Sequence, residues 1–138
     1  MTVKTIELRF DTRKDTVVDL TDKVWDAVRK SGIKNGIVLV FVPGSTGAIT
    51  TIEYEPGLQK DIFNALERIA PKKEEYFHNL RWGDGNGYSH VRASIVGPGL
   101  TVPLIDGRLE LGTWQQIVFL ELDNRDRHRR VIIQIVGE

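Results

Sequence analysis

Residues 81–90, RWGDGNGYSH, place an acid, an amide and an imidazole among three glycines. Asp84 can bind a cation or accept a proton, and Asn86 can donate and accept hydrogen bonds at once. A neutral imidazole at His90 can bind a metal or carry protons. Glycine permits positive φ and keeps bulk away from a ligand, so the stretch is a candidate ligand loop. A surface turn beside a structural histidine is the alternative.

His78, Asp84 and His90 lie close in sequence, and each can bind a metal. Their spacing does not match the HExxH pattern of helical zinc sites. The chain has no cysteine, so a metal site would use histidine, carboxylate or backbone oxygen. A divalent metal, Mg²⁺ or Zn²⁺, held by Asp84 and His90 is the prediction that these residues allow.

The segment VPGSTGAITTIEYEPG offers small hydroxyl groups after a buried strand. Ser45 and Thr46, beside glycine, let backbone N–H groups approach an anion, which favours phosphate binding. The segment lacks the GxxxxGK[ST] pattern, and a hairpin loop explains it as well. Glu53 follows in a predicted strand over 48–55, where alternation turns it toward solvent or a cleft.

Polar residues also interrupt the aliphatic segment RLELGTWQQIVFLELD. The alternation of a strand would place Thr113, Gln115 and Glu121 on one face. A buried amide without a partner costs about 1–3 kcal/mol, and a buried carboxylate needs a cation or hydrogen bonds. These residues predict a polar cluster within the fold, while Trp114 could simply fill the core.

The basic tract RDRHRR, residues 125–130, contains Asp126 and follows Asp123. A solvated hairpin turn is favoured over a nucleic-acid patch. An anion-holding role for one arginine is left open.

Hydrophobic periodicity predicts the elements that must position these residues. The predicted strands are 3–10, 36–43, 48–55 and three more between 101 and 137. The predicted helices run from an N-cap at Thr21 to Gly32 and from Pro56 to Pro71, while 91–100 fits either a helix or a strand. The β-branched run 36–43 predicts a strand buried on both faces. Turns are expected at 106–107 and 123–128.

The order of elements predicts one α+β domain over residues 1–138, an antiparallel β-sandwich of about seven strands in two sheets with flanking helices. With 41% hydrophobic and 28% charged residues, the chain is typical of a folded protein. Its net charge of zero argues against general nucleic-acid binding. No segment is typical of a secretory signal or a membrane helix, so we expect a cytoplasmic protein without nucleic-acid or membrane partners.

Three segments together, VFVPGSTGAITTIEYEPG, RWGDGNGYSHVRASIVGPGLTVPLIDGRLELGTWQQI and LELDNRDRHRRVIIQIVGE, resemble the YjbQ-like family. The resemblance runs from about residue 4 to Glu138. Members of this family have been described as uncharacterised or as secondary thiamine-phosphate synthases. The resemblance implies two small antiparallel sheets with helices alongside, assembled as a homotrimer around a threefold axis.

The resemblance also implies site residues. The positions that match the family motifs are Ser45, Thr46, Glu53, Asp84, Asn86, His90, Thr113, Trp114, Gln115 and Glu121. The chain departs from the pattern at Gly44, where many relatives carry histidine, and at Ile52-Glu53-Tyr54, where they carry Asn-Glu-Asn. The missing imidazole bears on any role that needs two histidines, for which His78 is the candidate replacement.

The activity that the resemblance implies is the coupling of a pyrimidine pyrophosphate to a thiazole phosphate. Asp84 and Glu53 would hold a metal, and His90 would steady or protonate the departing phosphate. The remaining roles fall to Ser45, Thr46 and Arg92 as phosphate donors and to Trp114 as a stacking platform. Two alternatives stay open, namely a non-catalytic binder of a small phosphorylated metabolite and a metal-dependent hydrolase.

Overall fold

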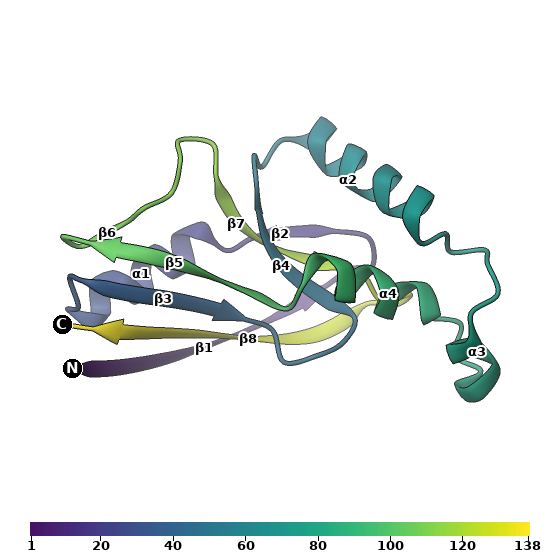
Figure 1. Cartoon of the computed structure of the whole chain (residues 1–138), viewed down its shortest axis with the longest axis horizontal. Helices are drawn as coiled ribbons and strands as arrows, with labels where there is room; N and C mark the ends of the chain where they lie inside the picture. The colour runs from purple at the N-terminus through teal and green to yellow at the C-terminus, as the bar shows by residue number, and fades with distance from the viewer.

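Two antiparallel sheets face each other in the computed structural model, which describes residues 1–138 (Figure 1). The five-stranded sheet has the order β1 (Thr2–Thr12), β8 (Arg127–Gly137), β3 (Gly36–Phe41), β5 (Gly99–Ile105), β6 (Arg108–Leu109). The three-stranded sheet has the order β2 (Val17–Asp19), β7 (Gln116–Glu121), β4 (Gly47–Ile52). The predicted α+β sandwich is confirmed, with eight strands because the short β2 was not predicted and the segment 108–121 divides into two strands, β6 and β7.

Helix α1 (Thr21–Ser31) covers one end of the main core. Val24, Ala27 and Val28 recur at helical spacing and join a cluster of 17 buried residues. The predicted stop at Gly32 is confirmed, since this glycine has a left-handed φ of 72°. Thr21 is the first helical residue rather than the N-cap, and its backbone N–H donates to Asp19 Oδ1 at 3.0 Å.

Strand β3 does not have the two buried faces that its β-branched run predicted. Val38 and Val40 are fully buried, whereas Ile37 is 49% exposed and Phe41 is 38% exposed. The strand pairs antiparallel with β5 and β8, and only one face of this sheet turns to the core. The β-branched run therefore buries one face of β3, while the other face is an exposed apolar surface.

Helix α2 (Pro56–Ile69) begins and ends where the sequence predicted. The Glu55 carboxylate accepts hydrogen bonds from the backbone N–H groups of Gly57 at 2.9 Å and Leu58 at 2.6 Å. These bonds satisfy two free donors of the first turn. Leu66 is the only fully buried residue of the helix, so α2 lies on the molecule rather than in its core.

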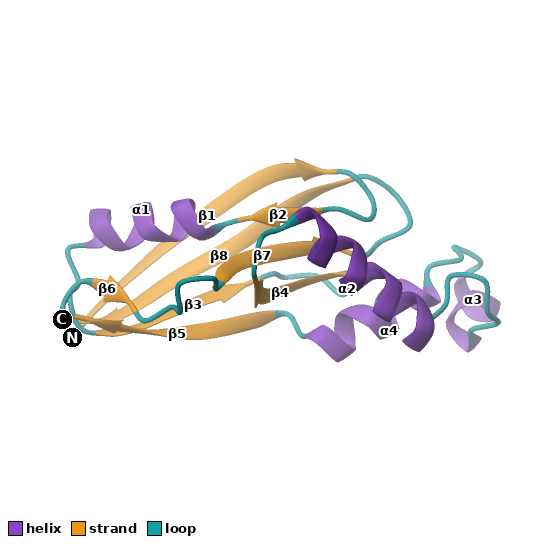
Figure 2. Cartoon of the chain, turned by 90° about the horizontal axis from the view of Figure 1, so that it is seen from above, coloured by secondary structure: helices purple, strands orange, loops and turns teal.

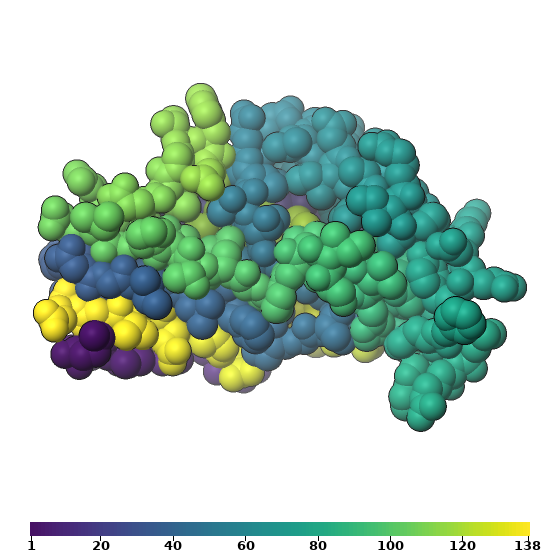
Figure 3. Space-filling view, viewed as in Figure 1, coloured from purple at the N-terminus to yellow at the C-terminus, as the bar shows by residue number.

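Two further helices, α3 (Phe77–Trp82) and α4 (Gly87–Val96), lie with α2 at the end of the sandwich opposite α1 (Figure 2). The ambiguous stretch 91–100 is therefore helical as far as Val96 and extended from Gly99. Helix α3 projects from the body of the molecule at the lower right of Figure 3. None of the four helices combines the length and apolar character needed to cross a membrane.

Candidate functional site

A polar hollow of about 500 Å³, hereafter the His90 hollow, lies where the loop before β4 meets the start of α4 and of β8. None of its lining residues is hydrophobic. They are Pro43, Gly44, Ser45, Thr46, Asp84, Asn86, His90, Asp123, Asn124, Arg125, Arg127, His128, Arg129 and Arg130. Ligand pockets are usually mostly apolar, so this lining favours a small, charged ligand.

The three glycines of the GDGNG segment, residues 83–87, are required for two different structural reasons. Gly83 and Gly85 adopt left-handed φ values of 70° and 69°, which link α3 tightly to α4. Gly87 has no such angle, but a Cβ at this position would lie 2.5 Å from Cβ of Tyr76. Its backbone N–H donates to Asn79 Oδ1 at 2.8 Å. The packed start of α4 at Gly87 places His90 in the first turn of a helix instead of in a loop.

The imidazole of His90 lies against that of His78, with ring centroids 4.3 Å apart. Asp84 Oδ1 is 3.5 Å from His78 Nδ1. Burial lowers the pKa of His90 below its ordinary value of 6.5, and His78 lowers it further, against the opposing charges of Asp123 and Asp84. His90 is therefore neutral at pH 7 and has both a donor and an acceptor nitrogen.

The same three residues are the ones expected to bind a metal. Two imidazoles and a carboxylate are ligands that zinc accepts. However, no three His, Asp or Glu side chains converge closely enough in this chain to hold a metal ion. The residues as arranged do not fit a metal centre.

A buried ion pair supports the floor of the hollow. Glu121 is fully buried, and the Arg129 guanidinium donates to both of its oxygens at 2.7 and 2.5 Å. Thr12 Oγ1 donates to the same carboxylate at 2.6 Å. A buried Glu121 was predicted to need a cation or hydrogen bonds, and it has both, from Arg129 and Thr12.

Asp123, which is only 1% exposed, is the second buried carboxylate. It is paired with Arg127 and accepts hydrogen bonds from Thr46 Oγ1 at 3.0 Å and Asn86 Nδ2 at 3.3 Å. Burial raises the pKa of Asp123, but hydrogen bonds, led by the one from the Asn124 backbone N–H, outweigh it and lower the pKa overall. Asp123 is ionised and neutralises Arg127.

Arg125 is the arginine of the hollow that has no carboxylate partner. Arg127 and Arg129 are neutralised by Asp123 and Glu121, and Arg130 pairs with Glu7 at 3.0 Å. Arg125 lines the hollow, is exposed, and forms no hydrogen bond or ion pair within the chain. The hollow therefore offers a free cation to an anionic ligand.

Asp123 was not predicted as a site residue, and the tract 125–130 was predicted to be a solvated turn, with an anion-holding role left open for one unspecified arginine. The 123–128 turn is confirmed, but it is a crossing between the two sheets rather than a solvated hairpin. A signal was present in the alternation of Glu121 with Asp123 and of Arg127 with Arg129. Two acids and two arginines at every second position on either side of a turn indicate charges that face each other.

Five of the predicted site residues line the His90 hollow, namely Ser45, Thr46, Asp84, Asn86 and His90. Arg92, expected to bind phosphate, is elsewhere and 1% exposed. Its Nε donates to the Ala70 carbonyl at 3.0 Å, and its Nη2 donates to Glu67 Oε1 at 3.0 Å. This arginine ties α4 to the end of α2.

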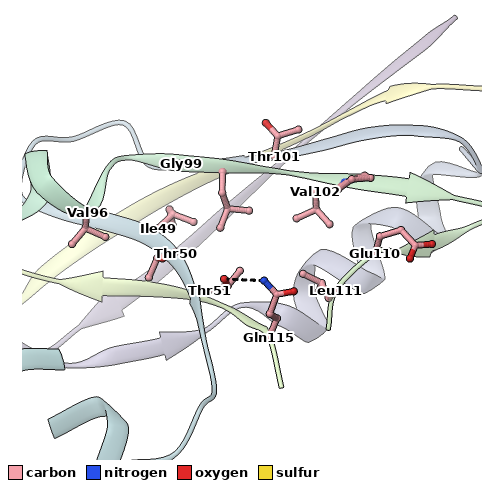
Figure 4. Close-up of a pocket in the computed structure, with 12 residues that line it drawn as sticks. Ile49, Thr50, Thr51, Val96, Gly99, Thr101, Val102, Glu110, Leu111 and Gln115 are labelled. Atoms are coloured by element: carbon pink, nitrogen blue, oxygen red, sulfur yellow. Dashed lines mark hydrogen bonds between the residues drawn. The ribbon is translucent and has the colours of Figure 1, made fainter. Parts of the chain in front are cut away.

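Glu121 pairs with Arg129 of the hollow, and the other predicted residues form a second group around Gly112–Gln115, hereafter the Trp114 turn. These residues precede β7, which begins at Gln116. The prediction that Thr113 and Gln115 share a strand face with Glu121 is therefore wrong. Gln115 Nε2 donates to Thr51 Oγ1 at 3.3 Å (Figure 4). Both residues line a groove of about 360 Å³ between β4 and β5. Trp114 is 70% exposed and does not fill the core.

Strand β4 separates the two groups. It begins at Gly47, next to Thr46 of the hollow, and ends at Ile52, next to Glu53. At about 3.3 Å per residue, the five steps of the strand cover about 17 Å. Within one chain, Glu53 and the Trp114 turn therefore do not join His90 in a single centre.

Comparison with known proteins agrees with this fold and these motifs. The family model of the UPF0047 protein YjbQ-like family matches residues 4–138. The chain belongs to this family. It is 42% identical over its whole length to a UPF0047 protein of Methanothermobacter thermautotrophicus, covering 95% of that protein. It is 32% identical to UPF0047 protein YugU of Bacillus subtilis over 98% of the chain and 99% of YugU.

Solved structures of relatives have the same fold. A YbjQ-like protein of unknown function from Sulfolobus solfataricus matches with a TM-score of 0.89 and 36% identity, over 99% of this chain and 100% of that chain. A hypothetical protein from Aeropyrum pernix matches with a TM-score of 0.91 and 34% identity, over 98% and 99% of the two chains. These relatives establish the family and the fold, and they carry no named activity.

Proposed function

We propose that the His90 hollow binds the phosphate group of a small metabolite. The observation that carries this proposal is the lining, which has no hydrophobic side chain and one arginine, Arg125, without a counter-charge. Ser45 lies exposed at the rim and adds a hydroxyl donor. Arginine and hydroxyl donors around a small hollow are the groups that recognise phosphate oxygens.

His90 gives the hollow a group that can move a proton. Its neutral imidazole can donate a hydrogen bond to a phosphate oxygen without the cost of burying another charge. A departing phosphate gains negative charge, and a proton or hydrogen bond at that oxygen stabilises it. Binding is the primary activity that we assign, and release of a phosphate or pyrophosphate group is the chemistry that His90 would assist.

Binding is tested by isothermal titration of the purified protein with inorganic phosphate and with pyrophosphate. We expect Arg125→Ala to weaken binding about 10- to 100-fold, because a hydrogen bond to a charged group contributes about 1.5–3 kcal/mol. Arg108→Ala is the matched control, since Arg108 is an exposed arginine of β6 without an ion pair. Equal affinities for the two variants would place the anion elsewhere.

The specific reaction that we propose is the thiamine-phosphate synthase-like coupling that the family resemblance implies. It is supported by a polar hollow that is lined by Arg125 and the His90 imidazole and by the resemblance itself. The assay combines both phosphorylated precursors with Mg²⁺ and compares the unaltered chain with Asp84→Ala and His90→Ala. Product formation that both substitutions leave unchanged would reject this site for the reaction. Heat of binding without product would leave a binding protein.

A further inference from the structure

A second cavity, which the proposed function does not use, lies between helix α2 and the start of β2 (Figure 2). Its volume is about 580 Å³, against about 500 Å³ for the His90 hollow, and we refer to it as the α2 groove. The two cavities have no lining residue in common. Volumes of about 300–1,000 Å³ are typical of sites for small molecules.

One face of α2 forms one side of the groove. Six residues at three- and four-residue spacing line this side, namely Pro56, Gln59, Lys60, Phe63, Asn64 and Glu67. Residues at this spacing lie on the same face of a helix. The other side of the groove is formed by Asp15 and Val17, and Lys72 lies at the C-terminal end of the helix.

Contacts at both ends of α2 set the width of the groove. Just before the helix, the Tyr54 hydroxyl donates to the Val17 carbonyl at 3.3 Å. Just after it, Lys72 Nζ donates to Asp15 Oδ2 at 2.5 Å. Between these two contacts, Leu66 is the only fully buried residue of the helix. The groove therefore exists without a ligand, as most small-molecule sites do.

The groove has an apolar base. Val17 is 8% exposed and belongs to the smaller of the two hydrophobic clusters, and Phe63 packs against the same cluster. The ring of Pro56 and the methylene stem of Lys60 add further apolar surface. An apolar group of a ligand can therefore be buried here, which the wholly polar lining of the His90 hollow does not allow.

The charged residues of the groove leave one cation without a partner. Lys72 pairs with Asp15, and Arg92, buried behind the groove, pairs with Glu67 at 3.0 Å. Lys60 is exposed and forms no ion pair or hydrogen bond through its side chain.

An amide lies next to this free cation. The side chain of Asn64 also forms no hydrogen bond within the chain. Residues four apart are neighbours on a helix surface, so Lys60 and Asn64 can donate to the same anion.

We infer that the α2 groove is a second ligand site, which takes a monocarboxylate with a compact apolar body. The carboxylate accepts hydrogen bonds from Lys60 and Asn64, and the apolar body lies over Val17 and Phe63. A second acidic group on the ligand would approach Asp15 or Glu67, which repel it, so the groove favours a single carboxylate. The inference does not depend on the proposed function, because the two sites share no residue.

Three probes test the two parts of this ligand class by isothermal titration. They are indoleacetate, its neutral analogue indoleacetamide, and acetate. We expect indoleacetate to bind about tenfold more tightly than the amide, at the lower end of what a hydrogen bond to a charged group contributes. We expect no measurable binding of acetate, which has no apolar body. Equal affinities for indoleacetate and indoleacetamide would overturn the inference.

Substitution of Lys60 locates the carboxylate. In Lys60→Gln, indoleacetate and indoleacetamide are expected to bind with the same affinity, because the cation that distinguishes them is gone. Lys60 is exposed, so its replacement leaves the core intact. Lys30→Gln is the matched control, since Lys30 is an exposed lysine in the last turn of α1 without an ion pair. The control should keep the preference for the acid.

The free arginine of the His90 hollow is the other cation that a carboxylate could meet. Arg125→Ala is expected to leave the affinity for indoleacetate unchanged, and saturating inorganic phosphate should not displace this probe. NMR spectra should show shifts of the backbone amides of residues 59–64 and of Val17. Weaker indoleacetate binding in Arg125→Ala, with no change in Lys60→Gln, would place the acid in the His90 hollow and overturn the inference. That result would leave the proposed phosphate site standing.

Discussion

The buried pair of Glu121 and Arg129 shows that a buried charge requires a partner of opposite charge. Glu121→Gln would leave the Arg129 guanidinium, 5% exposed, without its counter-charge. Loss of one partner of a buried pair costs about 3–5 kcal/mol, and we expect the free energy of unfolding to fall by that amount in urea titrations. The control is Glu7→Gln, because the ion pair of Glu7 with Arg130 is exposed and its loss should cost about 0–1 kcal/mol. Similar losses for both would contradict the assignment of Glu121.

The pKa of His90 makes a prediction about pH. Since burial lowers this pKa below 6.5, the unfolded chain takes up the proton first as the pH falls through 6.5. Stability contributed by neutral His90 is thus complete above pH 6.5 and is lost as the pH falls toward the folded pKa. The NMR titration of the His90 ring should have its midpoint below 6.5. His78→Gln should raise this midpoint, because His78 is the second cause of the shift.

Phosphate should move the same titration in the opposite direction from burial. An anion beside the imidazole favours its charged form and raises the pKa of His90. We expect the NMR midpoint to rise when inorganic phosphate is added and the protein to take up protons on binding below pH 6.5. A midpoint that phosphate does not move would mean that the anion binds away from His90.

Among the helices and strands, the start of α4 depends on a glycine for space rather than for its backbone angle. Gly87→Ala would place a Cβ 2.5 Å from Tyr76 Cβ, and overpacking of this kind typically costs about 1–3 kcal/mol. We expect a lower melting temperature and a displaced His90. Gly85→Asn is the comparison, because Asn tolerates left-handed φ and nothing lies closer than 3.9 Å at Gly85. Equal effects would contradict the steric explanation.

The N-terminal cap of α2 gives a prediction about the stability of this helix. Glu55→Ala removes the two hydrogen bonds that the carboxylate accepts from Gly57 and Leu58. Because only Leu66 of this helix is fully buried, packing cannot replace the cap, and the first turn should fray. Hydrogen exchange should accelerate at residues 58–60 and stay unchanged in α1. Unchanged protection of α2 would show that the cap is dispensable.

Long periodic elements could be predicted from the sequence because their own residues determine them. Helices α1 and α2 have apolar residues at helical spacing. Gly32 marks the end of α1, and Pro56 marks the start of α2. Short elements such as β2 and α3 have too few residues to show a period. The two-sided burial expected of β3 was wrong because the sequence of a strand does not say what lies on its outer face.

At the scale of the whole chain, the sequence correctly predicted several residues of the polar hollow. It also predicted residues for this site that the fold places elsewhere. Ser45, Thr46 and His90 meet there, although they come from distant segments. The separation of Glu53 from His90 follows from the course of β4 across the fold, and residue types alone do not reveal that distance. An anion-holding role was left open for one arginine of 125–130, but residue types alone do not show that Arg125 is the arginine without a carboxylate partner.

Because β4 is paired along its length with β7, the length of this strand sets the distance between the His90 hollow and Glu53. A one-residue insertion would turn every following side chain to the opposite face of the sheet, so the strand can change length only in steps of two residues. Each such step would move Glu53 about 7 Å farther from Thr46. A relative with a β4 two residues longer or shorter should therefore differ from this chain in that distance, even where every lining residue is the same.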